Sequence, residues 1–429
     1  MDFQQGLSGL NATSRNLAVI GNNVANSNTF GSKASRAEFA DMVSGSGAST
    51  VGIGVRLQTV SQAFTQGGMT TTDNPMDLAI SGTGFFQLKD DAGITYYGRN
   101  GQFKVNSDGY IVNNDGLRLQ GYGANSQGTI LPSSMVDLRL PNAGIAPQQT
   151  TQISMALNLD SRMSITKPAA ATGTTIDFND AKTFNNATSL SVFDVKGQEV
   201  ALTVYFQKDS VDTTTGEVTW NAFATANGTP TSVDGNGQPV AFTQVKFPLN
   251  GAAPSFPVGT ISLDIPATST TVNGVTNQIS EAISGVKVDL SKATQFGAAF
   301  NVTELKPDGY APGNLSDVKF EVDGTITARY SNGKTLSMGQ VQLANFRNPQ
   351  GLQPLGSNVW LANRLSGEPI TGTPGAGSLG ALQAGTLESS NVDLTAELIN
   401  MIAAQRSYQA NAQTIKTQDQ VLQTLVSMR

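Results

Sequence analysis

Apolar side chains at the start of the chain recur in steps of four and three residues, which is the spacing of one helix face. Small polar or glycine residues interrupt this stripe twice, so the apolar face is narrow. The pattern predicts a helix that cannot shelter its apolar face alone. The stripe consists of Phe3, Leu7, Leu10, Ser14, Leu17, Gly21 and Val24.

The same spacing runs for longer at the end of the chain, with the period of about 3.5 residues that coiled coils use. Asp393 is suited to cap this helix, and Glu397 lies in the first turn, where the helix dipole favours negative charge. The opposite face is polar, so Arg406, Gln413 and Gln420 must meet water or a polar lumen. The stripe consists of Leu394, Leu398, Met401, Gln405, Tyr408, Ala412, Ile415, Asp419, Leu422 and Val426.

Each terminal helix needs a partner, because a lone helix of about twenty residues is marginal in water. We expect the two helices to pair with each other as a coiled coil. The alternative is that each packs on the middle of the chain as an ordinary amphipathic surface helix. Residues 1–30 and residues 391–429 each have zero net charge. This suits the close packing of many copies, because like-charge repulsion would otherwise accumulate.

Between the ends, short alternating runs separated by glycine-containing turns predict a mainly β structure. Successive strands of the first set are expected to form hairpins. These strands lie at 85–88, 94–97, 102–105, 110–112 and 117–119, with turns at 91–93, 100–101, 108–109 and 115–116. A second set follows at 319–322 and 325–330.

A more variable block separates the two sets of strands. It holds a hairpin with strands at 190–193 and 200–206, while the Thr-, Ala- and Gly-rich stretches 169–175 and 268–274 are expected to be loops. If the chain ends pair, the simplest architecture is mainly β, with coiled-coil termini and nested, discontinuous domains. The expected divisions are a terminal helical domain at 1–30 and 388–429, a connecting segment at 31–70, a β-rich domain at 71–143 and 290–387, and an inserted outer β domain at 144–289.

Composition narrows the possible functions. The 429 residues carry a net charge of −6, so bulk charge favours neither nucleic acid nor an anionic membrane as a partner. The chain has no Cys and no His, which excludes disulfides, Cys/His zinc sites, thiol nucleophiles and His-based triads. Neither a cleavable signal peptide nor a membrane-spanning run is expected.

Individual candidate sites are weak. Gly333-Lys334-Thr335 lacks the earlier glycine of a phosphate loop, and Gly82-Thr83-Gly84 lacks the third glycine of a dinucleotide loop. The carboxylates at 73 and 77, and at 90 and 91, lie in hydrophilic turns, where acids are usually solvated. We therefore expect no enzymatic activity, no cofactor and no metal site.

Both ends of the chain nevertheless resemble a known family. Residues 22–33, NNVANSNTFGSK, resemble the N-terminal signature of the bacterial flagellar rod and hook axial proteins. Residues 387–394, LESSNVDL, and 401–411, MIAAQRSYQAN, are similar to the matching C-terminal signature. Residues 97–122 and 344–355 also resemble the family, and the large inserted block favours its hook members over the shorter distal rod proteins.

The resemblance implies an extracellular structural subunit of the bacterial flagellum. Many copies would form a short curved tube, a universal joint that passes motor torque from rod to filament. The terminal helices would form the inner tube, with the polar face as a candidate lumen lining and the two apolar stripes as the assembly seam. Export through the flagellar type III apparatus with an uncleaved N-terminus is implied. Other implied partners are the hook cap, the distal rod, the hook–filament junction proteins and the hook-length ruler.

Other classes remain open from the sequence. A distal rod-like axial protein is one alternative within the family. A secreted adhesin or phage-tail-like β fibre would share the composition, but it would not need matched helical stripes at both ends. A carboxylate-based glycosidase is the enzymatic alternative.

Overall fold

The computed structural model describes residues 3–43, 52–140, 144–166, 176–249, 253–256, 261–272 and 275–427. The chain divides into two compact units. The first unit combines Met1–Asn142, Ser316–Arg329 and Thr335–Arg429, and the second combines Ala143–Leu315 and Tyr330–Lys334. Both chain ends therefore belong to the same unit.

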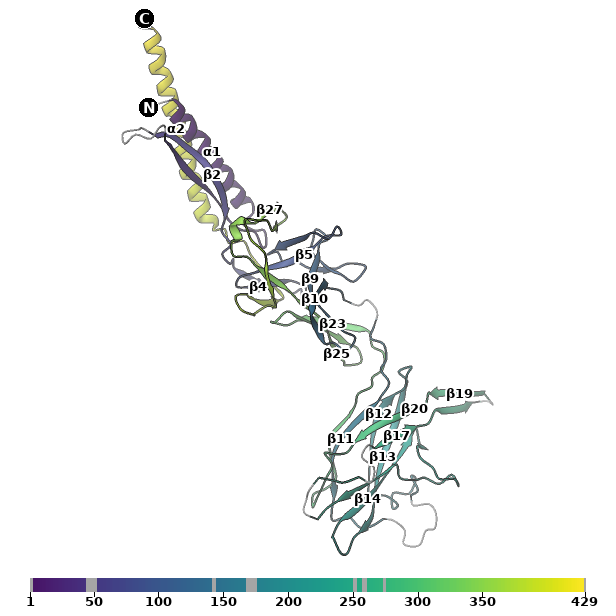
Figure 1. Ribbon diagram of the computed structural model, residues 1–429. Coiled ribbons are helices and arrows are strands. Elements are labelled where there is room, and N and C mark those ends of the chain that lie inside the picture. The colour runs from purple at the N-terminus through teal and green to yellow at the C-terminus, as the bar shows by residue number, and fades with distance from the viewer. Residues whose placement is uncertain are drawn as a thin grey trace. The chain divides into compact units, whose positions relative to one another are not determined.

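The first unit contains a helical layer built from the two ends of the chain (Figure 1). Helices α1 (Phe3–Ala25) and α2 (Leu394–Ser427) pack together, which confirms the expected pairing. The pair is antiparallel, because Gly6 lies against Ile415 whereas Asn23 bonds to Glu397. A hairpin of β1 (Ser35–Val43) and β2 (Gly52–Gln62) packs along α1.

The remainder of the first unit is a β domain. Its described strands form a 13-stranded sheet whose main path is β23-β24-β25-β9-β5-β6-β28-β27, and the pairs β3–β31 and β4–β30 lie beside it. Leu78, Phe86, Leu119 and Val341 are among the buried residues of its main core. The bounds are β3 Met69–Thr71, β4 Leu78–Ser81, β5 Phe85–Lys89, β6 Thr95–Gly98, β7 Lys104–Val105, β8 Ile111–Val112, β9 Arg118–Ala124, β10 Ile130–Asp137, β23 Leu315–Phe320, β24 Thr325–Tyr330, β25 Thr335–Val341, β26 Leu343–Asn345, β27 Gln353–Gly356, β28 Val359–Leu361, β29 Ile370–Gly372, β30 Ala381–Ala384 and β31 Thr386–Glu388, with a 3-10 turn at Pro349–Gly351.

The second unit contains two five-stranded sheets and one separate hairpin. A single hydrophobic core takes residues from both sheets, among them Met155, Leu202, Trp220 and Val286, so the sheets share one interior. The bounds are β11 Gln152–Asp160, β12 Asn186–Phe193, β13 Glu199–Val211, β14 Val218–Ala226, β15 Thr229–Pro230, β16 Thr243–Phe247, β17 Ser262–Ile265, β18 Thr268–Val272, β19 Val275–Ser280, β20 Ile283–Asp289, β21 Thr294–Phe296 and β22 Asn301–Pro307.

The mainly β fold with paired terminal helices is as expected, but two local predictions are wrong. The 100–101 turn does not close a hairpin, because β6 pairs with β5 and β28 whereas β7 pairs with β8. Gly101 instead lies directly against the Leu78 backbone, where a side chain would collide. Residues 268–272 form strand β18, paired with β19, and not a loop. The expected loop at 169–175 lies outside the described residues.

Candidate assembly surface

The two terminal helices approach each other closely through glycine. A Cβ atom added to Gly6 would lie 3.0 Å from Ile415 Cγ1, and one added to Gly9 would lie 3.0 Å from Asn411 Nδ2. Any larger residue at these positions would press on α2. Small residues in α1 therefore set the distance between the helices, a contact that the search for apolar stripes did not reveal.

Polar side chains fix the ends of this contact. Asp393 accepts hydrogen bonds from the backbone N–H groups of Thr395 and Ala396 at 2.9 and 3.1 Å, which confirms it as the N-cap of α2. Asn23 Nδ2 donates to Glu397 Oε1 at 3.0 Å and to Ser35 O at 2.7 Å. Asn23 therefore joins α1 to both α2 and the β1–β2 hairpin.

The predicted seam residues of α1 lie in different environments. Leu7 is exposed, whereas Leu10, Leu17 and Val24 are half-buried. Phe3 is the first residue of α1. The hairpin contributes to this burial, because β2 packs on α1 and Gly54 lies against Ser8. The α1 stripe is thus partly covered within one chain.

The predicted seam residues of α2 remain largely uncovered. Met401 and Ile415 are half-buried, but Leu398 is 45 % exposed and Val426 is 77 % exposed. Apart from the stripe residue Ile415, which contacts Gly6, the residues of α2 that contact α1, including Asn411, lie about a quarter turn around the helix from the centre of the stripe. The pairing of the helices therefore leaves most of the stripe bare. Its exposed members are Leu394, Leu398, Tyr408, Leu422 and Val426.

The end of α2 has no helical partner within the described chain. Helix α2 continues past the start of α1 (Figure 1). Val421 and Leu422 are exposed in this part of the helix. Among the described residues, this part of the helix therefore leaves apolar side chains in contact with water.

The candidate lumen residues share a different face of α2. Arg406, Gln413 and Gln420 are all exposed. They lie roughly opposite the α1 contact, at about 100° per residue around the helix. Helix α2 therefore has three different sides: one packs on α1, one carries the apolar stripe and one is polar.

A groove with a volume of about 820 Å³ runs between α1, the hairpin and α2. Its walls include Gly9, Asn16, Phe39, Asn400 and Ser407, so small and polar side chains predominate. The groove lies beside the α1–α2 contact and adds a second unfilled surface to the helical layer.

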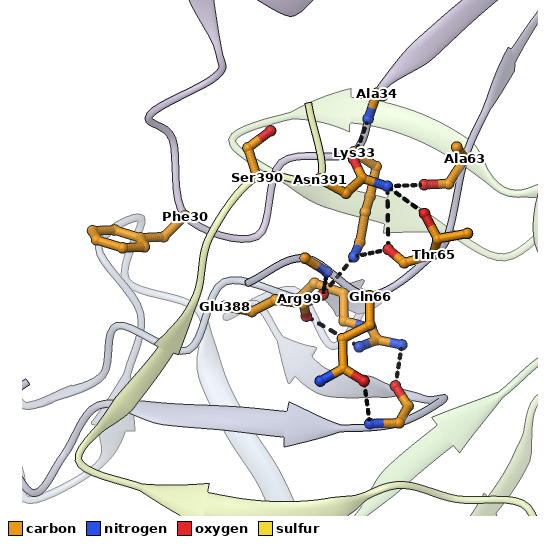
Figure 2. A network of polar contacts seen from close by, with 12 residues as sticks. Phe30, Lys33, Ala34, Ala63, Thr65, Gln66, Arg99, Glu388, Ser390 and Asn391 are labelled. Atoms are coloured by element: carbon orange, nitrogen blue, oxygen red, sulfur yellow. Dashed lines mark hydrogen bonds and ion pairs between the residues drawn. The ribbon is translucent and has the colours of Figure 1, made fainter. Parts of the chain in front are cut away.

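Below the helices, a buried ionic cluster joins the two chain ends to the β domain (Figure 2). Glu388, at the end of β31, has a side chain with 0 % exposure. Its Oε1 accepts from Lys33 Nζ at 2.6 Å and from Gly67 N at 2.9 Å, and its Oε2 accepts from Arg99 Nη1 at 3.1 Å. One carboxylate therefore holds two cations.

Both cations are removed from water. The side chains of Lys33 and Arg99 are 0 % and 3 % exposed. Burial lowers the pKa of Lys33, although its ion pair with Glu388 opposes the shift, and burial likewise lowers the pKa of Arg99. Lys33 Nζ also donates to Thr65 O at 2.8 Å, and Arg99 Nη2 donates to Gly82 O at 3.0 Å.

Asn391 extends the cluster toward α2. Its Oδ1 accepts from Ala34 N at 2.7 Å, and its Nδ2 donates to Ala63 O at 2.7 Å and to Thr65 Oγ1 at 2.9 Å (Figure 2). We call Lys33, Arg99, Glu388 and Asn391 the polar clamp. No sequence pattern marks the clamp as a site, although three of its members lie within the family signatures.

Three of the four candidate catalytic carboxylates have structural partners. Asp90 accepts from the Tyr96 hydroxyl at 3.1 Å, Asp91 pairs with Arg118, and Asp77 accepts from Asn74. Within the described ranges, no group of three or more acidic side chains is arranged to hold a metal ion. In the same ranges, no helix is long and apolar enough to cross a membrane.

Four protein-family models match successive parts of the chain. They are the flagella basal body rod protein (3–33), the flagellar hook protein FlgE/F/G D1 domain (79–179), the flagellar basal body protein FlaE D2 domain (158–310) and the flagellar basal body rod FlgEFG protein C-terminal (383–428). The matches cover both helices and strands of both units.

Curated relatives match over the full length. The chain is 40 % identical to the flagellar hook protein FlgE of Salmonella typhimurium and 39 % identical to that of Escherichia coli, with 100 % of each chain covered. The hook protein FlgE of Treponema pallidum is 32 % identical, with 99 % of this chain and 98 % of the relative covered. Among solved structures, Helicobacter pylori flagellar hook protein FlgE2 has a similar fold, with a TM-score of 0.53 and 14 % identity over 75 % of this chain and 100 % of that chain.

Proposed function

The chain belongs to the flagellar hook protein family and is a non-enzymatic, structural subunit of the extracellular hook, and we propose that it works there through its terminal helices. In this proposal many copies stack into a curved helical tube that acts as a universal joint. The tube transmits torque from the rod to the filament while it bends.

The observation that carries the proposal is the exposed apolar stripe of α2. Leu394, Leu398 and Leu422 remain exposed although α2 already packs on α1. Water-exposed leucines repeated along one helix face are stabilised when a neighbouring surface covers them. We infer that the covering surface is the helical layer of other copies. The proposed seam is the full set of apolar stripe residues in both helices.

The polar face of α2 has a separate role in the proposal. Arg406, Gln413 and Gln420 would line the export channel inside the tube, because they are exposed on the side away from α1. Residues 1–30 and 388–429 would then form the inner tube. Residues 71–143 and 290–387, and the inserted residues 144–289, would form two outer β domains, with 31–70 as the connection. The separate compact unit around the inserted block supports an inserted domain, but it also contains residues 290–315, which this division gives to the β-rich domain.

Bending requires outer contacts that exchange easily. Each row of subunits must shorten and lengthen on every turn of a bent rotating tube. Only 14 % of the residues are charged, so Ser, Thr, Asn and Gln supply much of the polar surface. Hydrogen bonds between such exposed groups contribute little individually, and water can replace them. Continuous strength would come from the inner helices.

The proposed partners follow from the place of the hook in the flagellum. They are the hook cap, the distal rod, the hook–filament junction proteins, the hook-length ruler and the type III export apparatus. The subunit itself would form the homopolymer. Nucleic acid and membrane insertion are not part of the proposal.

Amide hydrogen exchange on dilute monomer tests the role of neighbours. We propose that the terminal helices order fully only when neighbouring subunits cover their stripes. Amides of 394–425 should then exchange fast in the monomer and become protected in assembled tubes. Strong protection of this segment in dilute monomer would contradict the proposal.

A further inference from the structure

We propose that the polar clamp is a charge-dependent latch that fixes the terminal helices to the β domain and closes only when both chain ends are in place. Three segments meet at the clamp: the loop 26–34 after α1, the connection 63–68 after β2, and the connection 388–392 before α2. Each segment contributes a bonded group. The second and third segments are the described chain connections between the helical layer and the β domain, and the first joins α1 to the β1–β2 hairpin.

Sequence separation makes the latch dependent on the whole chain. Lys33 and Glu388 are separated by 355 residues, and Arg99 reaches the same carboxylate from the β domain. If the junction closed without Glu388, it would bury two cations with no counter-ion. Burial of unpaired charge is strongly unfavourable, so the junction stays open until the C-terminal segment arrives.

Backbone contacts lock the same segments together. Gly31 N donates to Glu388 O at 2.7 Å, and Ser389 N donates to Gly68 O at 2.8 Å. Gly31 has a φ of +70°, and a Cβ atom there would lie 2.5 Å from Asn100 N, so only glycine fits this close approach. The charge contacts and the backbone contacts therefore close as one unit.

Variants that change the buried charge can distinguish this latch from ordinary side-chain packing. With Lys33 and Arg99 positive and Glu388 negative, the buried net charge is +1. Glu388→Gln keeps the shape of the side chain but raises the charge to +2. Lys33→Met and Arg99→Met remove more contacts, yet each leaves one neutral ion pair. If charge closes the latch, the isosteric Glu388→Gln variant should open the junction more than either methionine variant does.

Amide exchange on the monomer of each variant tests the latch. The reporters are the amides of Gly31, Ala34 and Gly67, whose acceptors are Glu388 O, Asn391 Oδ1 and Glu388 Oε1. Glu388→Gln should accelerate their exchange on the order of a hundredfold, since breaking one side of a buried pair leaves uncompensated charge. Lys33→Met and Arg99→Met should accelerate it less than about tenfold.

The double variant Glu388→Gln with Lys33→Met provides the sharpest comparison. It returns the buried charge to +1, so its reporter amides should exchange more slowly than those of Glu388→Gln alone. If the second substitution instead adds to the damage, the side chains act through packing and the latch is refuted. Unchanged exchange in Glu388→Gln would refute it as well. Glu281→Gln, at the exposed pair with Lys196 in the second unit, is the matched control and should leave the reporters unchanged.

The role in assembly rests on the proposed function, and it can be tested separately. Glu388→Gln should raise the concentration needed for tube formation at least about tenfold, with partial recovery in the double variant. If Glu388→Gln opens the junction but forms tubes as readily as the native chain, the assembly role of the latch is refuted. Tube formation by the Leu398→Asp variant would instead refute the helical seam. The reporter amides of that variant would still measure whether the latch is closed.

Discussion

Replacement of Leu398 by aspartate separates assembly from folding. Leu398 is 45 % exposed in the single chain and lies on one helix, so the substitution removes about half of a leucine's burial from the subunit and leaves the cores of the β domains untouched. Full burial of a leucine contributes about 1.5–3 kcal/mol, and roughly half of this, about 0.7–1.4 kcal/mol, remains to be gained when a neighbour covers Leu398. Loss of that part alone corresponds to a rise of about three- to tenfold in the critical concentration for assembly.

An aspartate adds a larger cost, because the seam would enclose an unpaired carboxylate. Such burial costs several kcal/mol, so the Leu398→Asp protein should remain monomeric well beyond about a hundredfold above the native critical concentration. Leu398→Ala should show only the smaller effect. Leu422→Asp should behave like Leu398→Asp, because Leu422 is also exposed on the single chain.

Sedimentation and electron microscopy of concentrated protein measure the effect. Gln413→Asp is the matched control, because Gln413 is equally on the surface of α2 but belongs to the proposed lumen face. The control should form tubes near the native concentration. If Leu398→Asp and Gln413→Asp assemble alike, the assignment of the two faces is wrong.

Two further predictions concern the second unit. The indole Nε1 of the fully buried Trp220 has no hydrogen-bond partner in the described part of the chain. Trp220→Phe should therefore lower the free energy of unfolding by less than about 1.5 kcal/mol, whereas truncation of a large aromatic residue to alanine usually costs about 3–5 kcal/mol. Urea unfolding measures this loss, and a larger loss would contradict the prediction. The Arg162 side chain and backbone hold the pKa of Asp160 at about 2, below its ordinary value. The ionised Asp160 therefore stabilises the unit above about pH 4, and this contribution disappears as the pH falls through about 2. Asp160→Asn should flatten the stability profile between these values, as measured by urea unfolding at each pH, and an unchanged profile would refute the assignment.

The terminal helices were predictable because their signals are local. A repeating apolar stripe and an N-cap at Asp393 require only neighbouring residues, and both match the bounds of α2. The contact between the helices was not predictable in the same way. It uses Gly6, Gly9 and Asn411, which carry no apolar signal, because close backbone approach favours the smallest residues.

The polar clamp shows a second limit of sequence patterns. Glu388 has no charged residue within four positions, but Arg36 and Glu38 lie close after Lys33, so the local sequence offers little signal for the pair. Their pairing depends on tertiary structure, since 355 residues separate them. The β18 strand was missed for a different reason. A Thr-rich run next to glycine has the composition of a loop, but alternation and hairpin pairing make it a strand.

Electron cryomicroscopy of assembled tubes tests the central claim most directly. The account predicts that α1 and α2 form the wall of the central channel, with Leu398 and Leu422 covered by neighbouring subunits and with Gln413 and Gln420 facing the channel. Tubes in which the terminal helices lie on the outside, or in which the leucine stripe remains open to water, would contradict it.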